Sequence, residues 1–214
     1  MSEERYESPF SGRYSSKEML ALFSARRRHE TWRRLWVALA QAEHDLGLAI
    51  SQAQVDELSE KVTAIDYSVV EAKEREIRHD VMAHIYAFGQ VCPNAAGIIH
   101  LGATSCYVTD NADLILYRDA LRLIRAEIVP VLRNLSVFAS SYKALPTLGY
   151  THFQPAQLVT VGKRATLWMQ DLLMDLDEID DVLERVRFLG CRERQGLRQV
   201  LSSSLMAIRR KLIK

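Results

Sequence analysis

The segment LVTVGKRATLWMQDLLMDLDEIDDVLERV, residues 158–186, decides the fold class of this chain. Its apolar stripe repeats at intervals of three and four residues and comprises Leu158, Val161, Ala165, Trp168, Leu172, Leu176, Ile179, Leu183 and Val186. That period is typical of an amphipathic α-helix. A helix of this length with a continuous apolar seam normally packs on other long helices, often those of other subunits. The segment therefore predicts a helical bundle and an oligomer.

The rest of the chain predicts further helices. A capping box at Ser15 and Glu18 should open a helix that runs to about residue 46 and ends at Gly47. Within it, the arginines of residues 26–34 fall largely off the apolar face and predict a solvated surface. Further helices are expected at 52–61, 67–76, 80–91 and 110–142, the last kinked at Pro130, and the long helix should carry Pro155 in its first turn. Because no segment shows the alternation of a strand, the predicted class is all-α.

Composition restricts the function classes only weakly. Lys and Arg number 28 against 27 Asp and Glu, so overall charge indicates no nucleic-acid partner. Three cysteines, at 92, 106 and 191, have no zinc spacing, and an odd count argues against a disulfide framework. No signal peptide is recognisable, and no apolar run reaches the roughly 18 residues of a membrane span. We expect a cytoplasmic protein with no membrane partner.

Three motifs carry chemistry, and GYTHFQPAQ (residues 149–157) is the most informative. It places His152 on a turn rich in hydrogen-bonding side chains just before the long helix, a setting that suits a proton donor. The alternative is a structural histidine. HLGATSCYVTDN (100–111) puts Thr104 and Ser105 where a loop enters a helix, which suits an anion site or a simple N-cap. His100 either assists that site or is structural.

The third motif, RHDVMAH (residues 78–84), begins with Arg78, His79 and Asp80. Arginine suits a bidentate grip on an anion, and an aspartate can hold a neighbouring histidine in one tautomer. The alternative is a solvated helix terminus capped by the aspartate. No metal-ligand constellation or glycine-rich phosphate loop is present, so the sequence implies no metal and no cofactor.

From about residue 8 to 190, these motifs together resemble the adenylosuccinate lyases of the fumarase/aspartase superfamily. The resemblance implies elimination of fumarate from adenylosuccinate and from the succinylated imidazole-carboxamide ribotide of purine synthesis, by general acid/base catalysis. It makes His152 the proton donor to the departing nitrogen, with Thr151 and Gln154 orienting it. The residues it implies for substrate binding are Arg13, Tyr14, Arg78, His79, Asp80, Thr104 and Ser105, the first two on phosphate. A homotetramer is implied, with each active site built from several subunits. Another lyase of the superfamily is the weaker alternative.

The resemblance implies an N-terminal helical domain (1–105) and a partial, truncated helical bundle (106–190), followed by an aberrant tail (191–214). The tail carries a formal charge of +6 and the preceding 190 residues −5. Residues 194–200 can be back-translated so that a shifted frame reads TGTQAS, and residues 205–211 so that the same frame reads FDGD, both family-like stretches. We therefore hypothesise that the tail is out of frame.

The family's catalytic base is a serine on an SSxMPxKxNP-type loop that this sequence does not contain. We expect the chain to be inactive alone. The alternative is a non-catalytic helical fragment that associates with full-length subunits.

Overall fold

The computed structural model describes residues 8–190 and is mostly helical. In chain order its elements are η1 (Phe10–Tyr14), α1 (Lys17–Leu22), α2 (Ala25–Asp45), α3 (Gln52–Glu60), α4 (Tyr67–Ile77), α5 (Asp80–Val91), η2 (Ala96–Ile98), α6 (Ser105–Ser141), β1 (Pro146–Thr151), β2 (Gln154–Thr160) and α7 (Val161–Arg185). The contacts divide the described residues within α6 into one unit of residues 8–116 and 188–190, and a second unit of Tyr117–Arg187. The boundary expected at 105/106 stays a prediction, and the tail lies outside the described residues.

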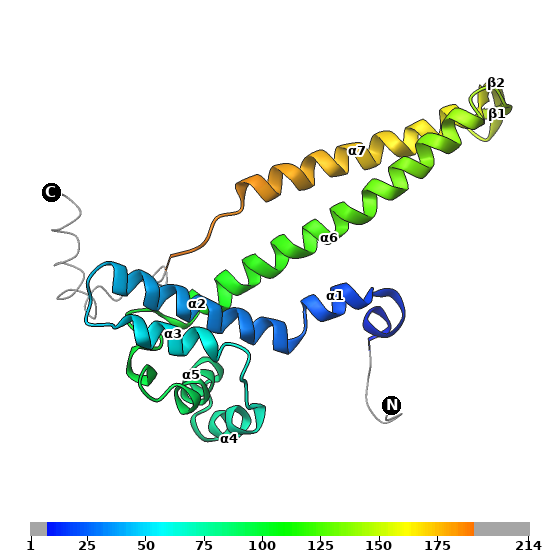
Figure 1. Cartoon of the computed structure of the whole chain (residues 1–214). Helices are drawn as coiled ribbons and strands as arrows, with labels where there is room; N and C mark the ends of the chain where they lie inside the picture. The colour runs from blue at the N-terminus through cyan, green and yellow to red at the C-terminus, as the bar shows by residue number, and fades with distance from the viewer. Residues whose placement is uncertain (1–7, 191–214) are drawn as a thin grey trace. The chain divides into compact units, whose positions relative to one another are not determined.

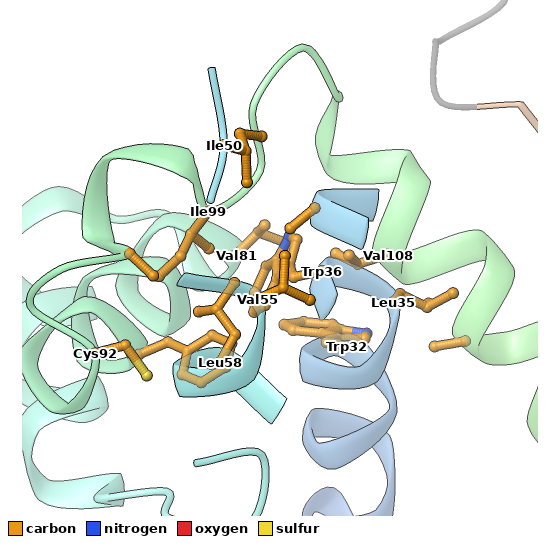
Figure 2. Packing of buried hydrophobic residues seen from close by; sticks show 14 residues of the cluster. Trp32, Leu35, Trp36, Ile50, Val55, Leu58, Val81, Cys92, Ile99 and Val108 are labelled. Carbon is orange, nitrogen blue, oxygen red and sulfur yellow. The ribbon is translucent and has the colours of Figure 1, made fainter. Parts of the chain in front are cut away.

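The first unit has a core built around α2. Figure 2 shows the indoles of Trp32 and Trp36 packed among aliphatic side chains of the other helices. The buried members of this cluster include Leu35, Ile50, Val55, Leu58, Val81, Phe88, Ile99 and Val108. Burial of a large apolar side chain contributes roughly 1.5–3 kcal/mol. The core therefore fixes the loops that lead into α5 and α6.

The second unit is an α-helical hairpin that ends in a β-hairpin. Figure 1 shows α6 and α7 running side by side, with β1 and β2 at their far end. Arg125 on α6 forms a bidentate ion pair with Asp180 on α7, at 2.6 and 3.1 Å. At the other end, the backbone N–H groups of Val161 and Gly162 donate to the carbonyls of Leu145 and Tyr142, both at 3.0 Å. The start of α7 is thus bonded to the turn that follows α6.

The predicted all-α class is confirmed, because the described residues are mostly helical, but the two short strands correct our expectation that no strand is present. Residues 154–160, which we placed partly in the first turns of the long helix, instead form β2, and Pro155 pairs with Tyr150 of β1. The sequence pattern did not predict these strands because both are largely exposed, so no alternation of apolar and polar residues marks a buried face. The long helix α7 begins only at Val161. Thr160 caps it, because its hydroxyl accepts the backbone N–H of Lys163 at 3.2 Å.

Three helix starts also differ from the expectation. Ser16, rather than Ser15, caps α1, because its hydroxyl accepts the backbone N–H of Met19 at 3.1 Å. The expected single helix to residue 46 is interrupted, since Ser24 caps a new helix by accepting the N–H of Arg27 at 3.2 Å. The helix expected from about residue 110 begins at Ser105. The ends at Gly47 (φ 82°) and the continuation of α6 through Pro130 are confirmed.

Arg33 contradicts the expectation of a solvated arginine face. Its side chain is completely buried. Nη1 donates to the carbonyls of Lys61 (2.8 Å) and Ala64 (2.9 Å), and the guanidinium carbon lies 4.2 Å from the ring centroid of Phe88. Burial lowers the pKa of Arg33 to about 10. The residue therefore ties α2 to the loop after α3.

Candidate functional site

The motif RHDVMAH spans the junction between α4 and α5. Arg78 ends α4 in the left-handed region (φ 55°). His79, rather than Asp80, is the N-cap of α5: its Nδ1 accepts the backbone N–H of Met82 at 3.4 Å. The Asp80 carboxylate accepts the N–H of Val81 at 2.7 Å and lies 3.7 Å from His79 Nδ1. The expected helix terminus is confirmed, but the histidine takes the capping role.

His79 and Ser105 are brought together from motifs 26 residues apart. His79 Nε2 lies 3.5 Å from the Ser105 hydroxyl oxygen. Since His79 Nδ1 accepts a backbone N–H, the ring proton resides on Nε2 and points to the serine. Ser105 is the first residue of α6, so this pair stands at a helix N-terminus, where backbone N–H groups favour an anion. Thr104 directly precedes it and its carbonyl accepts the N–H of Tyr107 at 2.9 Å.

Arg78 has a mixed electrostatic environment. It lines an open pocket together with Glu71, Glu74 and Arg75. Two carboxylates beside two guanidinium groups leave little net positive potential for an anion there. If Arg78 binds an anion, we therefore expect the anion on the side of His79 and not in this pocket.

Arg13 and Tyr14 lie on η1, ahead of the compact core. The Arg13 guanidinium carbon is 5.9 Å from the Tyr14 ring centroid. Both side chains are exposed. Among residues 8–190, no hydrogen bond or ion pair joins them to Arg78, His79 or Asp80, so their phosphate role stays a prediction.

His152 belongs to the second unit, at the tip of the β-hairpin. It is exposed, and strand β2 separates it from the long helix α7, which we expected it to precede directly. His152 (φ 50°) and Phe153 (φ 61°) form a two-residue loop with both residues in the left-handed region, as in a type I′ turn. Thr151 and Gln154 face each other across it. The hairpin therefore projects the imidazole, and the ring of Phe153, which is 99% exposed, into solvent.

Close backbone packing holds this hairpin in place. Gly149 lies at a bulge, and a Cβ there would be 2.7 Å from the carbonyl oxygen of Gln157. The Arg164 guanidinium, on the first turn of α7, donates to the carbonyl of Leu148 at 2.6 Å. Arg164 thus ties the start of α7 to strand β1 of the hairpin.

Sequence reasoning missed two residues near these motifs. Trp36 donates from its indole to Nδ1 of His100 at 3.0 Å, across 64 residues. Asn111 is 1% exposed and bonds to the backbone of Leu189. An asparagine in the apolar seam of a helix was the available signal for the second; nothing in the sequence links Trp36 to His100. In the described part of the chain, no group of three or more His, Cys, Asp or Glu could hold a metal ion.

Comparison with known proteins identifies the family. A family model described as "Lyase" matches residues 8–191, which is most of the chain. The chain belongs to this lyase family. The match ends where the resemblance was expected to end, and it confirms the superfamily inferred from the three motifs.

Individual relatives agree with this assignment. The chain is 50% identical to adenylosuccinate lyase of Saccharomyces cerevisiae over 196 residues, which cover 90% of this chain and 41% of the relative. It is 39% identical to adenylosuccinate lyase of Schistosoma mansoni over 212 residues, 99% of this chain and 44% of the relative. The crystal structure of 3-carboxy-cis,cis-muconate lactonizing enzyme from Pseudomonas putida matches with a TM-score of 0.81 at 26% identity, over 95% of this chain and 48% of that one. The chain therefore spans about two fifths of the length of the curated relatives it matches.

Proposed function

We propose that this chain supplies part of the active site of an adenylosuccinate lyase. The reaction eliminates fumarate from adenylosuccinate, and from the succinylated imidazole-carboxamide ribotide, by breaking a carbon–nitrogen bond. The 50% identity to the yeast enzyme is the observation that carries this proposal, and the pairing of His79 with Ser105 supports it. Elimination needs an acid for the leaving nitrogen and donors for the carboxylate that accumulates charge.

The described residues divide these tasks. His152 is the general acid, since its exposed position on a protruding tip lets it reach a leaving group held by other parts of the assembly. His79, Thr104 and Ser105 bind an anionic group of the substrate at the start of α6, with Arg78 and Asp80 beside them. Arg13 and Tyr14 bind the phosphate.

The base is expected on a loop that these 214 residues do not contain, so we propose that the 214 residues alone do not turn over substrate. A chimera tests the proposal: residues 8–190 replace the corresponding part of the yeast enzyme, and fumarate release is measured. Release from adenylosuccinate supports the assignment. Release only from argininosuccinate, aspartate or malate would instead favour another lyase of the superfamily.

The functional form is proposed to be a homotetramer of helical bundles acting on a small molecule. Large apolar side chains remain exposed on the two helices of the second unit, including Val131 and Val137 of α6 and Leu167, Trp168 and Met174 of α7. Apolar surface of this kind marks an association site. The same observation favours the second candidate function, a non-catalytic chain that joins full-length subunits. Co-purification with the yeast enzyme, followed by mass determination, separates mixed oligomers from self-association. Within residues 8–190, no helix is long and apolar enough to cross a membrane.

A further inference from the structure

One side of the His100 imidazole is held by the core of the first unit. The indole Nε1 of Trp36 donates a hydrogen bond to His100 Nδ1 at 3.0 Å, and the two rings stand nearly perpendicular, at 88°. Trp36 is 1% exposed and packs on Phe88. An indole N–H can only donate, so Nδ1 of His100 must be the unprotonated, accepting nitrogen.

The hydrogen bond from Trp36 determines the tautomer of neutral His100. With Nδ1 accepting, the ring proton resides on Nε2. Protonation of Nδ1 would set two donors against each other and leave a buried indole N–H without an acceptor, which is unfavourable. Burial, and then the nearby His79, also lower the pKa of His100. His100 is therefore held neutral, with one N–H free to donate.

The backbone places His100 at the start of the loop into α6. His100 itself adopts a left-handed conformation (φ 66°), two residues before Gly102 (φ 65°). The N–H of Ala103 donates to the His100 carbonyl at 3.3 Å, which folds the loop tightly before Ser105. A left-handed histidine is strained and persists only where its surroundings fix it. The bond to Trp36 is such a restraint.

His79 repeats the pattern at the same loop. Its Nδ1 accepts a backbone N–H, and its Nε2 faces the Ser105 hydroxyl. Two imidazoles from different motifs thus use the inner nitrogen as an acceptor and keep the proton on the other. Such an arrangement provides neutral donors for anionic oxygens.

We propose that Trp36 is a positioning residue that fixes His100 as its Nε2–H tautomer, so that His100 donates to a carboxylate or phosphate oxygen bound at the Thr104–Ser105 loop. This rests on the proposed function, because it assumes an anionic substrate at that loop. Trp36, a core residue, would thus position a residue of the site, and His100 would act there as a neutral hydrogen-bond donor.

The chain offers a matched control for Trp36. Trp32 lies one turn earlier on α2, is also buried, and its indole N–H has no hydrogen-bond partner among the described residues. Trp36→Phe and Trp32→Phe therefore make the same chemical change in the same core. Only the first removes a donor from a histidine.

Nitrogen NMR of the 214-residue chain with labelled histidine and tryptophan side chains tests the tautomer. The His100 signals are assigned by their loss in His100→Gln. We expect a protonated Nε2, an unprotonated Nδ1, and a scalar coupling across the hydrogen bond from the Trp36 indole, in the wild type and in Trp32→Phe. In Trp36→Phe, we expect a mixture of tautomers and a higher pKa of His100, because a bond to the neutral form is lost. A His100 that carries its proton on Nδ1 in the wild type, or equal spectra in both variants, would overturn the proposal. If Trp36→Phe does not fold, the coupling in the wild type decides alone.

Titration with fumarate and with inorganic phosphate tests the donor role and separates the two anions. A shift of the Nε2–H signal with one probe, retained in Trp32→Phe and lost in Trp36→Phe, supports the proposal and names the oxygen that is bound. No shift with either probe overturns the donor role. That outcome would leave the lyase assignment standing, since fumarate release by the chimera tests it separately.

Discussion

The amide of Asn111 and the backbone of Leu189 form two hydrogen bonds across 78 residues. Asn111 Oδ1 accepts the N–H of Leu189 at 2.8 Å, and Nδ2 donates to the Leu189 carbonyl at 3.1 Å. Nδ2 also donates to the carbonyl of Tyr107 at 2.8 Å, so all polar atoms of this buried amide are used. The segment that follows α7 is thereby fixed to the start of α6, close to Ser105.

Replacing Asn111 should destabilise the first unit. Asn111→Leu removes both hydrogen bonds to the backbone of Leu189, which is exposed and can bond to water instead, so the loss is the net contribution of about 0.5–1.5 kcal/mol per bond. We expect the free energy of unfolding to fall by about that amount in urea titrations. Asn94→Ala is the control, because Asn94 bonds to Glu57 on the surface and exposed substitutions stay within about 0.5 kcal/mol. An equal loss of unfolding free energy in the two variants would show that the hydrogen bonds of Asn111 do not stabilise the first unit more than a surface contact does.

Arg33 should be intolerant of substitution although its neighbour Arg34 is not. Arg33→Met removes two hydrogen bonds to the carbonyls of Lys61 and Ala64, and charged hydrogen bonds contribute about 1.5–3 kcal/mol each. Arg34 is exposed and pairs weakly with Glu30 at 3.7 Å, so Arg34→Met should change stability by less than about 0.5 kcal/mol. Denaturation midpoints of the two variants give the comparison. An unchanged midpoint for Arg33→Met would refute the buried role.

Gly162 should not accept a side chain. A Cβ at this position would lie 2.3 Å from the carbonyl oxygen of Ala139 and 2.8 Å from the backbone of Lys143, so α7 would have to move away from α6. Overpacking of this kind costs about 1–3 kcal/mol. Gly97→Ala is the control, since open space surrounds that glycine. Thermal unfolding followed by circular dichroism should show a lower Tm for Gly162→Ala alone.

The His84 side chain should make stability depend on acidity. Burial, then His29 and Arg33, lower the pKa of His84 to about 3, while Asp80 opposes them. The unfolded histidine titrates near 6.5, so between pH 6.5 and 3 the unfolded state binds more protons and stability falls as the pH falls. The maximum slope is about 1.4 kcal/mol per pH unit.

A variant isolates this contribution from the others. Glu43, whose pKa burial raises to about 7, has the opposite slope between pH 4.5 and 7. The difference in unfolding free energy between wild type and His84→Gln cancels that background. It should shrink steadily as the pH falls from 6.5 to 3. A difference that does not vary with pH would contradict a neutral, buried His84.

Local signals in the sequence predicted much of the first unit. The bounds expected for α3, α4 and α5 agree with the structure to within one residue, because each of these helices is short, periodic and capped by polar residues. Gly47 ended its helix as expected because a positive φ favours glycine.

Features that depend on distant partners were not predictable. The strands at 146–160 are stabilised by pairing across a His–Phe loop, which lacks the Asn–Gly signature of such turns. Arg33 looked solvated because its acceptors, the carbonyls of Lys61 and Ala64, are set by the loop after α3. The bond from Trp36 to His100 has the same origin, since only the packed core brings the two rings together.

The sequence motifs identified the candidate site residues, but the structure places some of them differently from what we expected. His79 and Ser105 were expected separately and lie in contact. His152 was expected beside a helix and lies on a hairpin tip, where its exposure suits a residue that acts on a substrate bound elsewhere. Its assignment as the acid stays a prediction.

We propose that His152 protonates the leaving nitrogen of adenylosuccinate. The direct measurement is kcat for fumarate release by the yeast chimera carrying His152→Gln, with His44→Gln as the control, because the His44 imidazole bonds to the Ile50 carbonyl of its own unit and belongs to none of the three motifs. Loss of a general acid lowers the rate by about 10²–10⁴-fold, so we predict that drop for His152→Gln and an unchanged kcat for His44→Gln. A kcat for His152→Gln equal to that of the parent chimera would show that His152 is not the general acid.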